Sequence, residues 1–288
     1  KDNGGTPSSG QVLTADGSGE GYWAAAGGPG TGESYVKIKA DGSASNTGSS
    51  TYAGYTAGNA LAHGSNFNTL FGYRAGLAIN SGNKNTCIGS NSGESITSAE
   101  YNTLLGYAAG DSITTGNNNT LSGQYSAAKL TTGGYNTFYG SSSGMAVTTG
   151  SSNIAIGSQA IGYVHGACTG SSNIAIGTDT LYNATSAEKI TTSWGNIGIG
   201  IEAFGASGNA QTAGENIAIG YRTLDVIETG NANIAIGRNA GGGITAASDN
   251  TLIGDYAGDG ITTGEKNIVI GAGAEASSST VNGEVTIG

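Results

Sequence analysis

The sequence predicts an all-β fold: a parallel β-solenoid (β-roll) of about 14 rungs built from 17-residue repeats. Three observations predict it: an asparagine that recurs at a nearly constant spacing, a short β-prone run after each asparagine, and a glycine that ends each run. The 54 glycines among 288 residues follow no three-residue period, which excludes collagen. A fixed period of this length indicates that each repeat buries its apolar residues against its neighbours.

The recurring asparagine sets the register, and we number it position one of each repeat. It occurs twelve times, with Glu284 in the same place in the last repeat and a looser first copy that begins at Ser50. The spacing between successive asparagines is 17, except for three consecutive intervals of 20, 23 and 20. The twelve are Asn68, Asn85, Asn102, Asn119, Asn136, Asn153, Asn173, Asn196, Asn216, Asn233, Asn250 and Asn267. The repeats therefore form a shaft over residues 50–288.

Residues 1–49 precede the repeats and are rich in turn residues. Residues 10–14 read as a short strand, followed by a tight turn and an aromatic residue, Trp23, that could cover it. Residues 34–40 alternate, with Val36 and Ile38 on one face, which predicts a half-buried strand. We expect this segment to connect or cap the shaft, because it has too little apolar surface for a core of its own.

Each repeat is expected to contain two short strands and two turns. Positions two to four, as in Ile154–Ile156, are β-branched or apolar and bounded by glycine. Position twelve is apolar in most repeats and begins Ile-Thr-Thr-Gly-like runs, such as the one at Ile113, which predict a second strand. Glycines at positions five and fifteen are expected to supply positive φ angles at the corners. The asparagine is suited to hold a turn through its side-chain amide.

Comparing the repeats with one another indicates what the first strand buries. Where position two is threonine, as at Thr137, position three is larger, as at Phe138; where position two is Ile or Val, position three is small or medium, as at Ala155. Adjacent strand residues point to opposite faces, so the pattern predicts that both faces are buried. A roll with so short a turn is too thin to bury both faces alone. We therefore expect an oligomer, most simply a homotrimeric rod.

The three longer repeats enlarge one corner, since all the extra residues fall between positions nine and twelve over residues 162–209. Insertions in solenoids often form a binding face. Aromatic rings with polar edges suit stacking on glycans. We therefore propose a receptor-binding surface at this corner, made by Tyr163, His165, Tyr182, Glu188, Lys189 and Trp194.

The composition excludes several other function classes. The formal net charge is -10, and no basic patch is present to bind nucleic acid. No apolar run is long enough to insert into a membrane. His63 and His165 lack partners at metal-ligand spacing, and no Gly-Lys-Ser/Thr phosphate loop occurs. We expect no catalytic site, no metal and no cofactor, and therefore no enzyme. Cys87 and Cys168 lie four rungs apart, too far for a disulfide.

Three alternatives have weaker support from the residues. Paired carboxylates for glycan cleavage could form between chains. Threonine columns could bind ice, but position two is expected to be buried and adjacent threonines point to opposite faces. A hexapeptide left-handed β-helix, typical of acyltransferases, fits Ile156 to Ala160, but needs its motif three times per turn, whereas here it occurs once.

The repeats resemble two known groups of fibrous proteins. Asn-Ile-Ala-Ile-Gly, which begins at Asn153, Asn173, Asn216 and Asn233, is similar to the head repeats of trimeric autotransporter adhesins. The longer unit, with Ala-Gly and Ile-Thr-Thr-Gly, resembles bacteriophage tail fibres. The resemblance covers residues 50–288 and implies a trimeric β-roll. Many such fibres lose a C-terminal chaperone by self-cleavage, and a chain that starts at Lys1 and stops within a repeat is expected to be a fragment or a processed product.

The sequence thus favours a structural and adhesive virion fibre, a phage tail fibre shaft that takes part in host-cell attachment. The expected partners are two further copies of the chain, a tail or baseplate protein at the N-terminal side, and a host surface glycan or protein receptor. The expected location is the virion, outside the cell. The alternative is a bacterial surface adhesin or extracellular filament subunit with the same roll.

Overall fold

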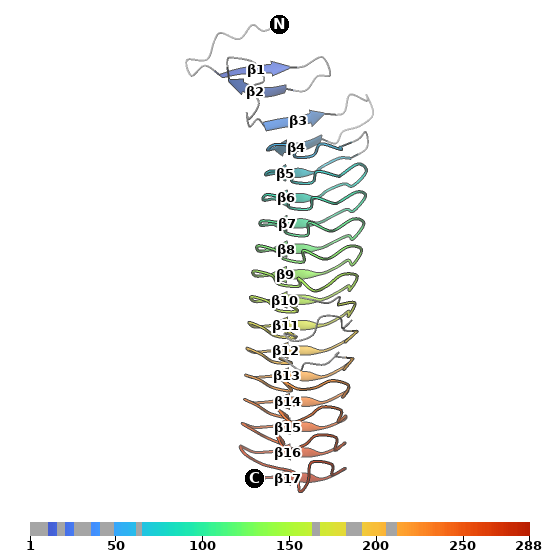
Figure 1. The fold of residues 1–288 in the computed structure, drawn as a ribbon, viewed down its shortest axis with the longest axis vertical. Coiled ribbons are helices and arrows are strands. Elements are labelled where there is room, and N and C mark those ends of the chain that lie inside the picture. Colours follow the sequence, from blue (N-terminus) through green and yellow to red (C-terminus); the bar gives the residue numbers. More distant parts are fainter. Residues whose placement is uncertain are drawn as a thin grey trace.

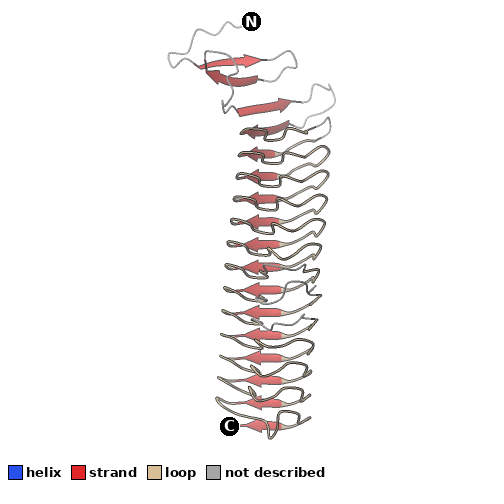
Figure 2. Cartoon of the chain, viewed as in Figure 1, coloured by secondary structure: helices blue, strands red, loops and turns tan. Residues whose placement is uncertain are grey.

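The structure, a computed structural model, describes residues 11–15, 21–25, 36–40, 49–61, 65–162, 168–182, 192–205 and 212–288. Every regular element in these residues is a β-strand (Figure 2). The chain forms one straight column, with the N-terminal strands at one end and β17 at the other (Figure 1). The strands are β1 Gln11–Ala15, β2 Gly21–Ala25, β3 Val36–Ala40, β4 Ser49–Ala53, β5 Thr69–Phe71, β6 Thr86–Ile88, β7 Thr103–Leu105, β8 Thr120–Ser122, β9 Thr137–Tyr139, β10 Ile154–Ile156, β11 Ile174–Ile176, β12 Ile197–Ile199, β13 Ile217–Ile219, β14 Ile234–Ile236, β15 Thr251–Ile253, β16 Ile268–Ile270 and β17 Val285–Ile287.

Strands β4 to β17 pair in parallel, each with the next along the chain. Equivalent repeat positions stand opposite each other: Thr103 pairs with Thr120, and Leu104 with Leu121. The register also holds across the long intervals, where β10, β11 and β12 remain in step. The predicted all-β parallel solenoid, in which a regular repeat forms each rung, is therefore confirmed.

The three strands before the shaft are antiparallel. β1 and β2 form a hairpin in which Leu13 pairs with Trp23, and β2 then pairs with β3. β3 is the strand predicted from the alternation around Val36 and Ile38, and it pairs with β4 over five residues. Because β3 occupies the outer edge of β4, the first parallel strand does not present an open edge to solvent.

The core lies inside the column and is built from a few repeat positions. Position three, the middle residue of each strand, is buried in β5 to β16, as at Leu70, Leu104 and Val269. Position twelve faces it from the other side of the rung, as at Ile113 and Ile244, both without exposed surface. Stacking equivalent apolar residues of successive repeats produces a continuous core that no single repeat could form.

Position nine adjusts the volume of this core. In the rung of Asn136, position three is Phe138 and position nine is Gly144, where an added Cβ would collide with the phenyl ring. In the rung of Asn196 the two residues are exchanged: Gly198 is at position three, and Phe204 fills the space from position nine, 3.1 Å from a Cβ built on Gly198. The bulk that leaves the strand is therefore regained inside the same rung. The sequence pattern placed all of this bulk on the opposite face of the strand, and that placement is wrong, because position nine inside the rung supplies it.

The predicted second strand is also wrong: each described rung has only one three-residue strand. Around position thirteen several amides converge on one carbonyl. The N–H groups of Asn80, Ser81 and Gly82 all donate to the Thr97 carbonyl, at 3.1 to 3.2 Å. A ladder needs one partner for each amide, so this convergence curls the backbone into bends. One isolated bridge, between Val147 and Cys168, is the only pairing among the described position-twelve and position-thirteen residues.

Glycine has different roles at two positions: it is required at position five and is common at position fifteen, where other rungs have Ala99 or Ala247. At position five the φ angles lie near +135°, and a Cβ on Gly106 would also meet the carbonyl oxygen of Gly123 in the next rung at 2.5 Å. At position fifteen, for example at Gly133, φ is not positive, but a Cβ would collide with the carbonyl oxygen of Gly150. The expected positive φ at position fifteen is therefore replaced by close approach of neighbouring rungs.

The twelve asparagines form a buried ladder along the column. The Asn136 side-chain amide donates to Asn119 Oδ1 and to the Gly150 carbonyl, both at 3.0 Å. Its own Oδ1 accepts the backbone and side-chain N–H groups of Asn153, at 3.0 and 3.1 Å. Ser50 Oγ starts the ladder by accepting the Asn68 amide, and the Glu284 amide ends it on Asn267 Oδ1. The asparagines hold the turn as predicted, but the positive φ falls on the preceding residue, such as Tyr135 at 61°.

Candidate interaction surfaces

One face of the column carries a strip of side chains that the single chain leaves uncovered. We call it the outer strip and define it as positions two and four of β4 to β17. None of its side chains is charged, although the chain contains 10 Lys and Arg and 20 Asp and Glu. The strip consists of Thr51, Ala53, Thr69, Phe71, Thr86, Ile88, Thr103, Leu105, Thr120, Ser122, Thr137, Tyr139, Ile154, Ile156, Ile174, Ile176, Ile197, Ile199, Ile217, Ile219, Ile234, Ile236, Thr251, Ile253, Ile268, Ile270, Val285 and Ile287.

The outer strip changes character at β10. From β4 to β9 position two is always threonine, beside larger residues such as Phe71 and Leu105 at position four. From β10 to β17 both columns are aliphatic apart from Thr251. These side chains are between half-buried and exposed, with Ile156 at 40% exposure. Thr120 and Thr137 are exposed in the single chain, so the burial expected for the position-two threonines requires a partner. The reason is that position three alone fits inside a rung.

Exposed aromatic residues gather around the first half of the shaft. Tyr55 and Tyr73 stack in neighbouring rungs with ring centroids 5.9 Å apart, and Lys84 Nζ donates to the Tyr101 hydroxyl at 2.6 Å. Within the described ranges, the exposed aromatics after residue 140 are Trp194, Tyr221 and Tyr256, whereas those before it are Tyr55, Phe67, Phe71, Tyr73, Tyr101, Tyr107, Tyr125, Tyr135 and Tyr139. The exposed aromatics before residue 140 were not among the predicted site residues. Their signal was aromatic residues at the positions just before and after successive strands.

The predicted receptor-binding corner is described only in part. Tyr163, His165, Glu188 and Lys189 lie outside the described residues, so their grouping stays a prediction. Tyr182 is half-buried, and Trp194 is 53% exposed. Trp194 follows the inserted segment and lies beside Gly214 in the next rung, where a Cβ would meet the indole Nε1 at 3.0 Å. The absence of a side chain at residue 214 therefore makes room for the indole.

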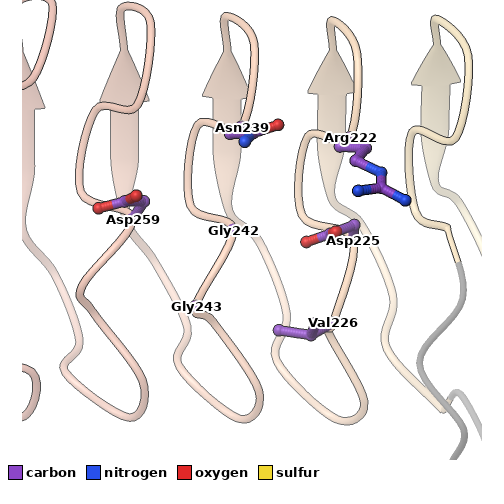
Figure 3. Close-up of a pocket in the computed structure, with 7 residues that line it drawn as sticks. All are labelled: Arg222, Asp225, Val226, Asn239, Gly242, Gly243 and Asp259. Atoms are coloured by element: carbon purple, nitrogen blue, oxygen red, sulfur yellow. The ribbon is translucent and has the colours of Figure 1, made fainter.

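A shallow hollow opens at the corner of rungs β13 to β15 (Figure 3). It has a volume of about 330 Å³, and Gly242 and Gly243 leave it open between Asp225 and Asp259 on the adjoining rungs. Burial raises the pKa of Asp225. Beside the hollow, burial and a hydrogen bond with Asp259 raise the pKa of Glu275 to about 7. Among the described residues no three His, Cys, Asp or Glu side chains gather at metal-binding distance.

Charged residues lie at the corners and link successive rungs. Arg74 pairs with Glu94 at 2.6 Å, and Arg238 pairs with Asp255 through two hydrogen bonds at 2.7 and 2.8 Å. The Arg238 guanidinium holds the pKa of Asp255 below its usual value. Exposed pairs of this kind contribute little stability, typically below about 1 kcal/mol. Their position matters more than their energy: the charged side chains lie at the corners, and the outer strip is left neutral.

Neither cysteine forms a disulfide, and Cys87 is fully buried, which raises its pKa to about 12. A buried thiol of this kind is protonated near neutral pH and is therefore a weak nucleophile. A search of the described segments found no helix that could cross a membrane.

Comparisons with known proteins add no relative to these observations. No protein-family model matches the chain, and neither a curated protein nor a solved structure matches it.

Proposed function

We propose that the chain is the shaft of a structural and adhesive fibre, a homotrimeric virion fibre of the phage tail-fibre type that takes part in host-cell attachment. The observation that carries the proposal is the outer strip. The single chain fills the interior of the rod with its own side chains, but it leaves this uncharged strip uncovered. A monomeric soluble protein rarely exposes so long an apolar surface without a partner. The rod form suits a spacer that holds a tip or a ligand away from its base.

The dimensions of the rod support a mechanical role. Fourteen rungs at about 4.8 Å give a shaft roughly 65 Å long. Each rung is held to the next by strand hydrogen bonds, the asparagine ladder and the stacked core, so the rungs from β5 to β10 form one continuous body. A load along the axis is then shared by many equivalent bonds.

The adhesive part of the proposal rests on exposed aromatic side chains. Rings such as Tyr135, which is 68% exposed, present an apolar face and a polar hydroxyl to solvent. A host surface glycan or protein receptor is the partner we propose for these residues and for the enlarged corner. A tail or baseplate protein is the partner proposed at the N-terminal side, and the proposed location is the virion outside the cell.

Native mass spectrometry, combined with electron microscopy of single particles, tests the proposal. We expect an assembly of three chains, with three times the 28.1 kDa mass of one chain and the shape of a rod. Binding of labelled assembly to candidate host cells should then be lost when Tyr55 and Tyr135 are replaced by serine. A folded single copy in solution at micromolar concentration would contradict the fibre proposal.

A further inference from the structure

The outer strip is large enough to need a partner along its whole length. Three residues at about 3.3 Å each make it roughly 10 Å wide, and 14 rungs at about 4.8 Å make it roughly 65 Å long. Its area is therefore about 600 Å², of which the aliphatic part from β10 to β17 is about 400 Å², the size of the largest apolar patches found on monomers. Patches of this size often bind a partner.

Charge narrows the choice of partner. The chain has a net charge of -10, and its acids and bases lie at corners, such as Glu94, Asp225 and Arg238, while the outer strip has none. A partner must bring an equally uncharged and elongated surface. A second copy of this chain does so, with the same repeat spacing, and its rungs match the strip one for one.

The area is consistent with this partner. Two strips that face each other would bury about 1,200 Å² in total, the lower end of specific protein interfaces. Half the length would bury only about 600 Å², the size of an adventitious crystal contact. Contact over the full strip, from β4 to β17, is therefore required.

The change of character at β10 selects the orientation. If two copies ran in opposite directions, the aliphatic columns of β12 to β17 would face the threonines of β9 to β4, and only β10 and β11 would face aliphatic strands. In parallel copies, Ile217 and Ile219 meet isoleucine, and the threonine half meets threonine and aromatic residues. Burying aliphatic against aliphatic surface gains about 25 cal/mol per Å², and the threonine hydroxyls then face other hydroxyls with which they can hydrogen-bond, rather than isoleucine side chains. If one copy were shifted by one rung along the other, the threonine of β9 in one copy would face the isoleucine of β10 in the other.

We propose that the outer strip is an interface between copies of this chain that lie parallel and in register. This rests on the proposed function in that it requires the chain to assemble. Parallel copies around an axis along the rod form a closed ring of contacts, with position two of one strip beside position four of the next. The exposed aromatics at the flanks, such as Tyr55 and Tyr135, remain outside the contact.

Cross-linking of single introduced cysteines tests both the surface and the orientation. Ile268→Cys places a thiol on the strip in β16, and Thr263→Cys places one on an exposed turn outside the strip. The wild-type chain is the blank, because Cys87 and Cys168 are buried. With a short bis-maleimide under native conditions, we expect most Ile268→Cys chains to be linked to each other and Thr263→Cys chains to stay single. Circular dichroism checks that each variant is folded.

A mixed sample decides the orientation. Thr69→Cys lies in β5, opposite β16 in an antiparallel arrangement, so links between the Thr69→Cys and Ile268→Cys chains, without self-links, would overturn the parallel interface. Equal linking of the Thr263→Cys chain would overturn the surface assignment, as would unlinked Ile268→Cys chains in an assembled protein. Sedimentation of the wild type keeps the two proposals apart: a monomer contradicts the fibre itself, whereas an assembly without the strip links contradicts only this interface.

Discussion

Replacing one asparagine of the ladder should weaken the shaft far more than replacing an exposed asparagine. The variant Asn136→Ala removes four hydrogen bonds. Two of the partner atoms keep another partner: Asn119 Oδ1 still accepts the residue 136 amide, and Asn153 Nδ2 still donates to the Gly170 carbonyl. The buried Gly150 carbonyl and the backbone N–H of Asn153 each lose the hydrogen bond that Asn136 gives them, and no other described residue replaces it.

The magnitude follows from these two orphaned groups. A buried polar group left unsatisfied costs about 1–3 kcal/mol, so the expected loss in the free energy of unfolding is about 4 kcal/mol. The matched control is Asn117→Ala. Asn117 is exposed and its side chain accepts a single bond from the Glu100 amide at 2.7 Å, and its loss should cost less than about 1 kcal/mol.

Urea unfolding followed by circular dichroism measures the difference between the two variants. Both are compared at one chain concentration, because association adds to apparent stability. Hydrogen exchange of the peptide that contains Asn153 gives a local readout and should accelerate only in Asn136→Ala. If the two variants unfold within about 1 kcal/mol of each other and exchange alike at residue 153, the ladder does not hold the rungs together as argued.

Three further predictions concern the corners and the core. Gly106→Ala should destabilise by several kcal/mol in thermal unfolding, because its φ is positive and a Cβ meets the next rung; Gly273→Ala, with a positive φ and open space, should cost only about 1 kcal/mol. Phe138→Ala should lose about 3–5 kcal/mol in urea unfolding. Adding Gly144→Leu should recover part of this loss, and no recovery would contradict the exchange of volume between positions three and nine. Stability should fall as pH rises from about 4.5 to about 7, because the pKa of Glu275 is raised in the folded state to about 7 and the proton shared with Asp259 is lost. Glu275→Gln should remove this part of the pH profile, and an unchanged profile would contradict the assignment.

The parts of the fold that the sequence could predict are those repeated in every rung. The asparagine spacing gave the rungs, and the run after each asparagine, such as Thr86 to Ile88, gave the strand. The glycine at position five was predicted for the right reason, since its φ is positive throughout. Repetition removes the ambiguity of a three-residue strand, because equivalent positions must stack on one another.

The errors arose where the sequence does not say which side of the backbone is inside. The change from Phe138 to Ala155 at position three, together with threonine to isoleucine at position two, suggested bulk moving between two faces. The compensating residue is at position nine, as the buried side chains of Phe204 and Leu224 show. The second strand failed because Ile-Thr-Thr has strand propensity, and propensity does not reveal that several amides share one carbonyl.

The candidate surfaces were only partly predicted for the same reason, because the sequence does not say which repeat positions share an outer face. Insertions drew attention to residues 162–209, yet the described exposed aromatics are concentrated before residue 140. An aromatic residue at one repeat position has no meaning until the structure places neighbouring positions on the same flank. Tyr139 is the last residue of β9 and belongs to the outer strip, whereas Tyr135 precedes the strand and flanks the strip.

The absence of charge in the outer strip is the strongest constraint that the repeats reveal. The repeats tolerate wide variation at corners, where position seven is Arg74, Tyr125, Asp179 or Gln159 in different rungs. Solubility would favour the same freedom at positions two and four, since exposed strand faces are usually made polar or charged to prevent association. Every one of these positions instead stays neutral, and the second half is aliphatic. A surface that varies in size but never in charge is suited to be covered, which is why we propose the chain-to-chain contact there and the ligand contacts at its flanks.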